Sequence, residues 1–133
     1  MAVILVADDF LENRDILCRM LEFVGHRTLS AANGQEALEL AQVHRPDIIL
    51  MDLSMPVLDG WEATARIKAC DDLHHIPVLA VTGHVTPHEI QRAFDAGCVD
   101  YIAKPVDFER LIGKVMTLLN NGSGTKPPAA GLP

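Results

Sequence analysis

Short apolar runs alternate along the chain with segments in which apolar residues recur every three to four positions. The runs lie at residues 2–7, 27–31, 47–51, 77–81 and 99–103. The first, third and fourth are apolar at consecutive positions, which is typical of strands covered by helices on both faces. The segments between them have the period of amphipathic helices. The pattern therefore predicts five strands, each followed by a helix.

Residues that begin and end helices agree with this alternation. Asn33, Asp59 and Thr86 each stand three residues before a glutamate, the spacing of a capping box or its Asx equivalent. Gly25 and Gly97 follow the first and fourth predicted helices, where a C-terminal glycine is common. Repeated strand and helix units predict an α/β fold, a (βα)₅ doubly wound parallel sheet of flavodoxin-like architecture.

Length and composition place this fold in a single domain. Hydrophobic residues form 49 % of the 133 residues, enough for a core, but no run approaches the roughly 20 apolar residues of a membrane span. No basic segment precedes the first apolar run, as a signal peptide would require. We expect a soluble, cytoplasmic domain over residues 1–120 and a flexible tail or linker stub over residues 121–133, which are rich in Gly, Pro and Ala.

The charge of the chain limits the classes of molecule that it can bind. The net charge is −7, and the 11 Lys and Arg residues are scattered along the chain, which argues against direct nucleic-acid binding. The three cysteines have no C-x-x-C spacing, so they indicate neither a disulfide framework nor a thiolate metal site. We therefore expect neither a nucleic acid nor a membrane as a partner.

Chemically active side chains follow four of the five predicted strands. Asp8 and Asp9 follow the first strand, Asp52 the third, Thr82 the fourth and Lys104 the fifth. In open α/β sheets the ligand site lies beyond the carboxyl ends of the strands, so we expect these side chains to meet in one cleft. The second strand is followed only by an alanine and an asparagine, which fits an edge strand and the order 2-1-3-4-5.

Three carboxylates in one cleft require a positive partner, because a pair ~4 Å apart repels by about 4 kcal/mol at an effective dielectric of 20. Lys104 supplies one charge, and oxygen ligands without His or Cys favour Mg²⁺. A cation, a carboxylate, a hydroxyl and an ammonium group together suit phosphoryl transfer onto a carboxylate. Asp52 is the predicted nucleophile, with Thr82 and Lys104 contacting the phosphoryl oxygens.

The segments "ADD", "MDLSMPVLDG", "AVTGH" and "KP" resemble, in order and spacing, the receiver domain of two-component response regulators over residues 2–120. The resemblance implies a signalling phosphoacceptor and not an enzyme with an external substrate. The donor would be a sensor histidine kinase or a histidine phosphotransfer protein. A downstream protein would bind the face formed by the fourth helix, fifth strand and fifth helix. Whether the chain is a single-domain regulator or a piece of a longer protein stays open.

The resemblance also assigns the acceptor and the metal ligands. Asp52 would be the phosphorylation site and one of the ligands of Mg²⁺. Asp9 would bind the ion directly, and Asp8 through water or a second contact. The main-chain carbonyl of Ser54 would complete the protein ligands.

Other positions would hold the phosphoryl group and report its presence. Thr82 and Lys104 would contact its oxygens, assisted by the Gly83 amide. Tyr101 would be the switch aromatic that moves inward as Thr82 is drawn toward the phosphate. The Lys104–Pro105 bond would be cis.

Two variable positions of receivers tune the lifetime of the phosphoryl group, and here they are Ser54 and His84. Neither is an amide or a carboxylate suited to orienting the attacking water. We therefore expect a lifetime of minutes or longer.

Three other functions are weighed against this one. A Mg²⁺-dependent phosphohydrolase of the aspartyl-phosphate type needs a separate acid or base and a lid, for which no insertion is long enough. A nucleotide or flavin binder needs a Gly- or Ser/Thr-rich loop where this chain has Asp8 and Asp9. A degenerate receiver that binds its partner without phosphorylation would lack acceptor or metal positions, all of which are filled here.

Overall fold

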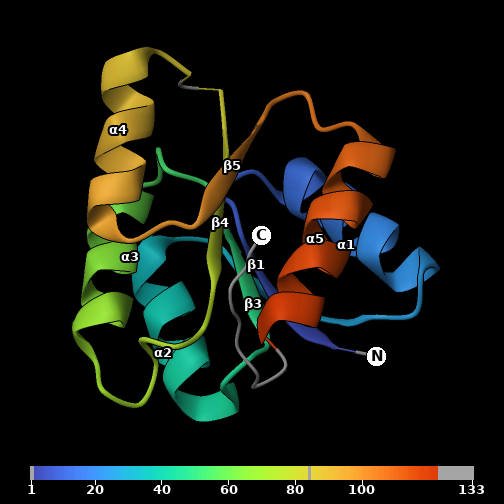
Figure 1. Ribbon diagram of the computed structural model, residues 1–133, viewed down its shortest axis with the longest axis horizontal. Coiled ribbons are helices and arrows are strands. Elements are labelled where there is room, and N and C mark those ends of the chain that lie inside the picture. The colour runs from blue at the N-terminus through green and yellow to red at the C-terminus, as the bar shows by residue number, and fades with distance from the viewer. Residues whose placement is uncertain (1, 84, 123–133) are drawn as a thin grey trace.

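A computed structural model of the chain describes residues 2–83 and 85–122 and contains five strands and five helices that alternate in sequence (Figure 1). The strands are β1 (Val3–Ala7), β2 (Arg27–Ala31), β3 (Ile48–Met51), β4 (Val78–Thr82) and β5 (Asp100–Ala103). The helices are α1 (Leu11–Phe23), α2 (Gly34–His44), α3 (Gly60–Ala69), α4 (Pro87–Ala96) and α5 (Phe108–Gly122). The predicted (βα)₅ alternation is confirmed.

The strands form one parallel sheet in the order β2-β1-β3-β4-β5, as predicted. Helices α1 and α5 lie on one side of this sheet, and α2, α3 and α4 lie on the other (Figure 1). The fold is thus the doubly wound flavodoxin-like arrangement, with β2 at one edge and β5 at the other.

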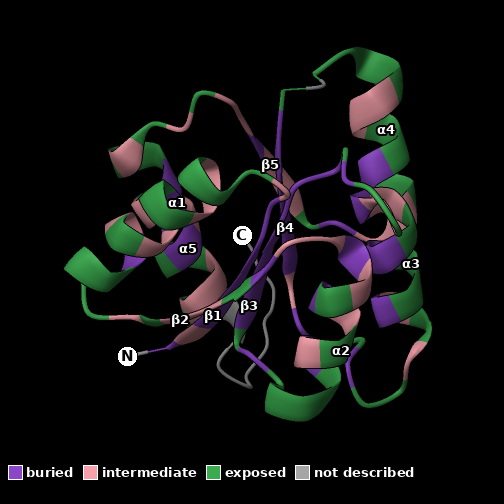
Figure 2. Cartoon of the chain, turned by 180° about the vertical axis from the view of Figure 1, so that it is seen from behind, coloured by how far each residue is buried: buried purple, intermediate pink, exposed green. Residues whose placement is uncertain are grey.

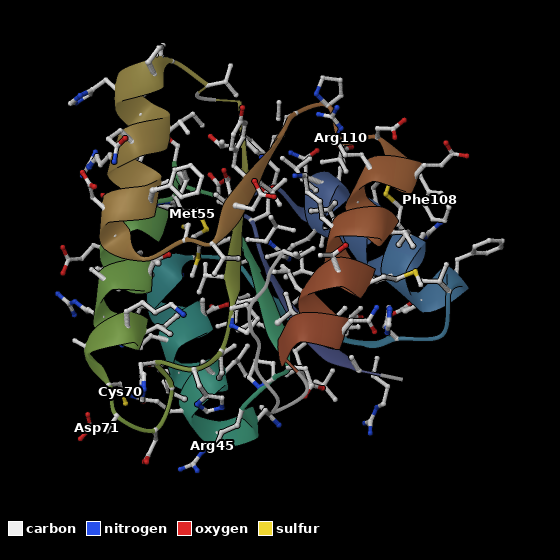
Figure 3. The ribbon with its side chains drawn as sticks, in the orientation of Figure 1. Arg45, Met55, Cys70, Asp71, Phe108 and Arg110 are labelled. Carbon is white, nitrogen blue, oxygen red and sulfur yellow. The ribbon has the colours of Figure 1, made fainter. Side chains whose placement is uncertain are left out.

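Each face of the sheet has its own apolar cluster, because successive side chains of a strand point to opposite sides. On the side of α2, α3 and α4 the cluster includes Leu5, Ala7, Ile49, Met51, Ala37, Ala63 and Ile67. On the side of α1 and α5 it includes Ile4, Val6, Leu50, Leu79, Leu17, Leu21, Leu111 and Val115. The central strands β1, β3 and β4 are almost fully buried, whereas the edge strands β2 and β5 are partly exposed. The helices are exposed on their outer sides (Figure 2), and side chains fill the space between them and the sheet (Figure 3).

The predicted helix ends are confirmed in detail. Asn33, Asp59 and Thr86 each accept a hydrogen bond from the backbone N–H three residues later, at 2.9, 2.8 and 3.3 Å. Gly25 and Gly97 have φ angles of 96° and 117°, which favour glycine. Capping side chains therefore set where α2, α3 and α4 begin, and glycines with positive φ follow the ends of α1 and α4.

The observed boundaries differ slightly from those predicted. Thr82 is the last residue of β4 and does not follow it. Helix α5 runs to Gly122 and so contains the first two residues of the segment predicted as a tail. Residues 123–133 lie outside the described part of the chain, so the tail stays a prediction.

The Lys104–Pro105 peptide bond is cis, as the family resemblance implied. No helix in the described part of the chain is both long enough and apolar enough to cross a membrane.

The loop between β3 and α3 has an unusual backbone. Val57 has a φ of 69° although it is β-branched, and its side chain is 80 % exposed. The left-handed region costs a residue with a Cβ roughly 1–2 kcal/mol. This conformation is therefore imposed on Val57 by the rest of the loop, since the exposed side chain contributes little packing.

We predict that Val57→Asn stabilises the protein. Asparagine tolerates the left-handed region better than valine, so the free energy of unfolding should rise by about 1 kcal/mol. Urea unfolding of both proteins measures the change. Val43→Asn is the control, because Val43 is also exposed but lies in helix α2, and it should give no such gain. Equal or lower stability of Val57→Asn would show that the position is not strained.

Candidate functional site

Backbone hydrogen bonds bring the predicted site residues to one edge of the sheet. The amide of Asp52 donates to the carbonyl of Ala7 at 2.9 Å, which holds the residue after β3 beside the residue before Asp8. The amide of Lys104 donates to the carbonyl of Thr82 at 2.9 Å, which joins the ends of β4 and β5. The carboxyl ends of β1, β3, β4 and β5 therefore meet, as predicted.

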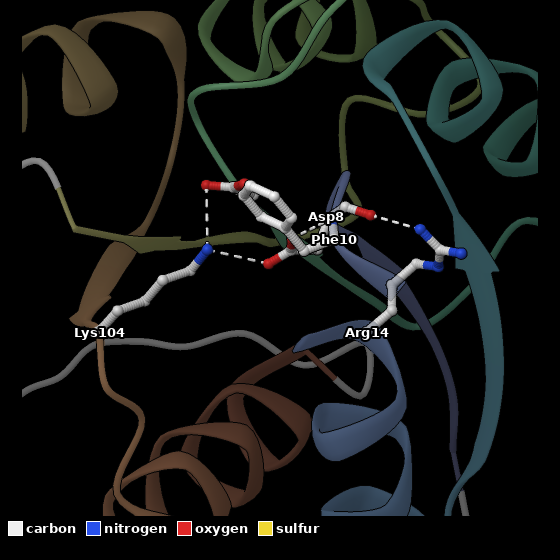
Figure 4. A network of polar contacts seen from close by, with 5 residues as sticks. Asp8, Phe10, Arg14 and Lys104 are labelled. Atoms are coloured by element: carbon white, nitrogen blue, oxygen red, sulfur yellow. Dashed lines mark hydrogen bonds and ion pairs between the residues drawn. The ribbon is translucent and has the colours of Figure 1, made fainter. Parts of the chain in front are cut away.

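Lys104 forms ion pairs with two of the three aspartates (Figure 4). Its Nζ lies 2.9 Å from Asp8 Oδ2 and 3.5 Å from Asp52 Oδ1. Asp8 is fully buried and Asp52 is 5 % exposed, so both charges are largely removed from solvent. An unpaired carboxylate in such a position would be costly, which makes Lys104 part of the site's stability as well as of its chemistry.

The other oxygens of Asp8 have partners too. Its Oδ1 accepts a hydrogen bond from the Phe10 amide at 2.9 Å, and its main-chain carbonyl accepts one from Arg14 Nη1 at 2.8 Å. Figure 4 shows Arg14 reaching back from α1 to this carbonyl. Asp8 is thus fixed in place from both sides.

Burial controls the ionisation of the acceptor candidate. Burial raises the pKa of the Asp52 carboxyl from 3.8 to about 6; Lys104 opposes the shift, and the charges of Asp8 and Asp9 add to it. Burial alone would lower the pKa of Lys104, but its hydrogen bond to Asp8 and the charge of Asp52 outweigh this and raise it. Lys104 is therefore a stable cation, whereas Asp52 is ionised only at the cost of desolvation.

The aspartates have the arrangement of a cation site. One oxygen each of Asp8, Asp9 and Asp52 lies within 4.8 Å of the others. Asp9 Oδ1 is buried and has no hydrogen-bond partner among the described residues. A buried carboxylate oxygen without a partner is expensive unless a cation pairs with it. An all-oxygen set of this charge suits Mg²⁺, so the residues present fit the predicted ion.

The remaining predicted residues are placed as follows. Thr82 is buried, and Tyr101 is half-buried in β5, where it packs against the cluster on the α2, α3 and α4 side. Ser54 and Gly83 are exposed. His84 lies outside the described residues. The functional roles of all the predicted site residues, including Thr82, stay predictions.

Sequence reasoning missed the two residues that hold Asp8. The Phe10 amide contact is an Asx turn, which an aspartate directly after a strand could have suggested. The Arg14 contact had no sequence signal, because it joins a side chain in α1 to a main-chain oxygen.

Comparison with known proteins gives one consistent result. Residues 4–116 match the model of the response regulator receiver domain. The polar-differentiation response regulator DivK of Brucella anthropi is 39 % identical over 120 residues, which cover 90 % of this chain and 97 % of that protein.

Solved structures agree with this match. The chemotaxis protein CheY4 of Vibrio cholerae has a TM-score of 0.85 and 30 % identity, with 90 % of this chain and 99 % of that chain covered. The receiver domain of a sensor histidine kinase from Pseudomonas aeruginosa has a TM-score of 0.84 and 32 % identity, covering 90 % and 98 % of the two chains. That structure has a magnesium ion coordinated in its active-site cleft.

We predict that Asp52→Asn stabilises the protein in metal-free buffer at neutral pH. The folded state raises the pKa of Asp52 to about 6 from 3.8, so ionised Asp52 lowers stability, and this loss develops as the pH rises from about 4 to about 6. Removing the charge should increase the free energy of unfolding by about 1 to 3 kcal/mol at pH 7 and by less than about 1 kcal/mol at pH 4. Urea unfolding of both proteins at the two pH values measures the difference. A gain of equal size at both pH values would contradict the electrostatic cause.

Proposed function

The chain belongs to the response regulator receiver family, and from this membership we propose that Asp52 accepts a phosphoryl group from a phosphohistidine donor. Receiver domains of this type interact with histidine kinases or histidine phosphotransfer proteins, so a protein of one of these kinds is the proposed donor. The observation that carries the proposal is the buried Oδ1 of Asp9, which has no hydrogen-bond partner among residues 2–83 and 85–122 and lies beside the Asp52 and Lys104 pair. No finding supports the alternative of a Mg²⁺-dependent phosphohydrolase.

The proposed reaction is an in-line displacement. A carboxylate oxygen of Asp52 attacks phosphorus, the bond between phosphorus and the imidazole nitrogen breaks, and the imidazole keeps the electron pair and takes up a proton. Lys104 neutralises charge on the transferred oxygens, and the Thr82 hydroxyl and Gly83 amide donate hydrogen bonds to them. Lys104 is suited to this role because it is held 3.5 Å from Asp52.

Asp9, Asp52 and the main-chain carbonyl of Ser54 are the proposed protein ligands of Mg²⁺. When bound, the ion would offset charge on the carboxylates and the phosphoryl oxygens. Asp8 would act through water or a second contact, because its own carboxylate oxygens already bind Lys104 and the Phe10 amide.

The proposed output is a protein contact on α4, β5 and α5. Thr82 would move toward the phosphoryl group and Tyr101 would turn inward. Within this face Lys114 of α5 forms an ion pair with Asp100 of β5 at 2.5 Å, and both residues line a pocket of about 220 Å³. The rate of amide hydrogen exchange, measured before and after treatment with beryllium fluoride, should change more over α4, β5 and α5 than over α2.

A cytoplasmic location stays part of the proposal.

We predict that acetyl phosphate and Mg²⁺ add one phosphoryl group to the protein. Asp52→Asn should abolish this gain, because an amide nitrogen and its carbonyl oxygen do not replace an ionised nucleophile. Intact-mass spectrometry measures the modification. Asp72→Asn is the matched control, since Asp72 is an exposed aspartate paired with Arg45 on the surface, and it should be modified like the unaltered protein. An unmodified parent protein, or a phosphorylated Asp52→Asn variant, would refute the proposed acceptor.

We also predict that the phosphoryl group has a half-life of minutes or longer in the presence of Mg²⁺. Ser54 and His84 carry no amide or carboxylate to orient the attacking water. Ser54→Asn adds an amide there and should shorten the half-life severalfold, on the order of the effects of general acid–base groups or less. Loss of the added mass with time measures the rate. Val57→Asn places the same amide elsewhere in the loop and should leave the half-life unchanged, whereas a parent half-life of a few seconds would overturn the assignment of these two positions.

A further inference from the structure

The amino end of helix α2 is pressed against the loop that follows the acceptor. The Gly34 amide donates a hydrogen bond to the carbonyl of Leu58 at 2.9 Å. A Cβ at Gly34 would lie 2.1 Å from that carbonyl oxygen and 2.8 Å from its carbon, closer than real side chains come. The contact is made through backbone on both sides, so no side-chain movement could accommodate the extra atom.

The same loop is held at its other end by helix α3. The Gly60 amide donates to the carbonyl of Leu53 at 2.8 Å, and a Cβ at Gly60 would lie 2.1 Å from the carbonyl oxygen of Asp52. Between the two attachments, Val57 is kept in the left-handed region. The loop therefore takes a path that the two helix ends impose on it, and this path begins at the acceptor itself.

The amino end of α2 is a firm support for such a contact. Asn33 Oδ1 accepts from the Glu36 amide at 2.9 Å, and Glu36 Oε1 accepts from the Ala32 amide at 2.8 Å. This reciprocal capping fixes the first turn of α2 next to Gly34. A displacement at the contact should therefore move the loop and leave the helix in place.

We infer that Gly34 is a positioning residue for the acceptor site, acting through Leu58 on the loop that carries Ser54. The inference rests on the proposed function, since it concerns the oxygens that would bind Mg²⁺. This ion demands near-ideal octahedral geometry, so a shift of the loop by a fraction of an ångström should weaken binding. Groups that orient metal ligands without touching the metal typically change metal affinity by about 10–100-fold when altered.

The test compares Gly34→Ala with the parent protein in a titration with MgCl₂, followed by the NMR amide signals of residues 8–9 and 52–54. Gly34→Ala should bind the ion about tenfold more weakly or worse. Gly113→Ala is the matched control: it makes the same change in helix α5, where nothing lies within 4 Å of the added Cβ, so it should keep the parent affinity. In metal-free buffer, amide exchange of residues 53–59 should be faster in Gly34→Ala than in Gly113→Ala.

The outcomes separate this inference from the proposed function. A parent protein that does not bind Mg²⁺ refutes the proposed function. A parent that binds, together with unchanged affinity in Gly34→Ala or an equal loss in Gly113→Ala, refutes the positioning role. If Gly34→Ala does not fold, the pair to compare is Val57→Asn with and without Gly34→Ala, because Val57→Asn should add stability without changing the contact at Leu58.

Discussion

The structure is organised around the repulsion among three neighbouring aspartates, two of which form ion pairs with one lysine. Asp8 and Asp52 are buried, and the ion pairs of Lys104 with both compensate only part of the cost of removing two carboxylates from water. The raised pKa of Asp52, to about 6, reflects the uncompensated remainder. Strongly perturbed charges of this kind are typical of functional sites, and the arrangement fits the proposed cation and phosphoryl group.

The rest of the fold makes this cost tolerable. Two apolar clusters cover the faces of the sheet, and full burial of each large aliphatic side chain contributes about 1.5–3 kcal/mol. Two backbone hydrogen bonds between strand ends hold the site residues in the sheet. The Asp52 amide donates to the Ala7 carbonyl, and the Lys104 amide donates to the Thr82 carbonyl. The aspartates cannot move apart without breaking these bonds or the packing of β1 and β3.

Most of the fold, and the residues that lie together at the ends of the strands, could be predicted from the sequence because they depend on local patterns. The caps at Asn33, Asp59 and Thr86 and the residues at the strand ends are each visible within a few positions of the chain. The close approach of Gly34 to Leu58 could not be predicted, because it depends on how two segments meet in space. Val24 illustrates the same limit: it is apolar and stands three residues after the buried Leu21, yet it is the C-cap residue of α1 and is 39 % exposed.

Two adjacent aspartates acquire different roles through their hydrogen bonds. Both oxygens of the Asp8 carboxylate are engaged, one by Lys104 and one by the Phe10 amide, whereas Asp9 Oδ1 is buried and has no partner in the described part of the chain. Asp8 therefore fixes the position of Lys104, while Asp9 keeps an oxygen available for a cation. Sequence position alone does not distinguish the two residues. The distinction arises where the chain turns at Phe10, whose amide binds Asp8, while one oxygen of Asp9 lies within 4.8 Å of oxygens of Asp8 and Asp52.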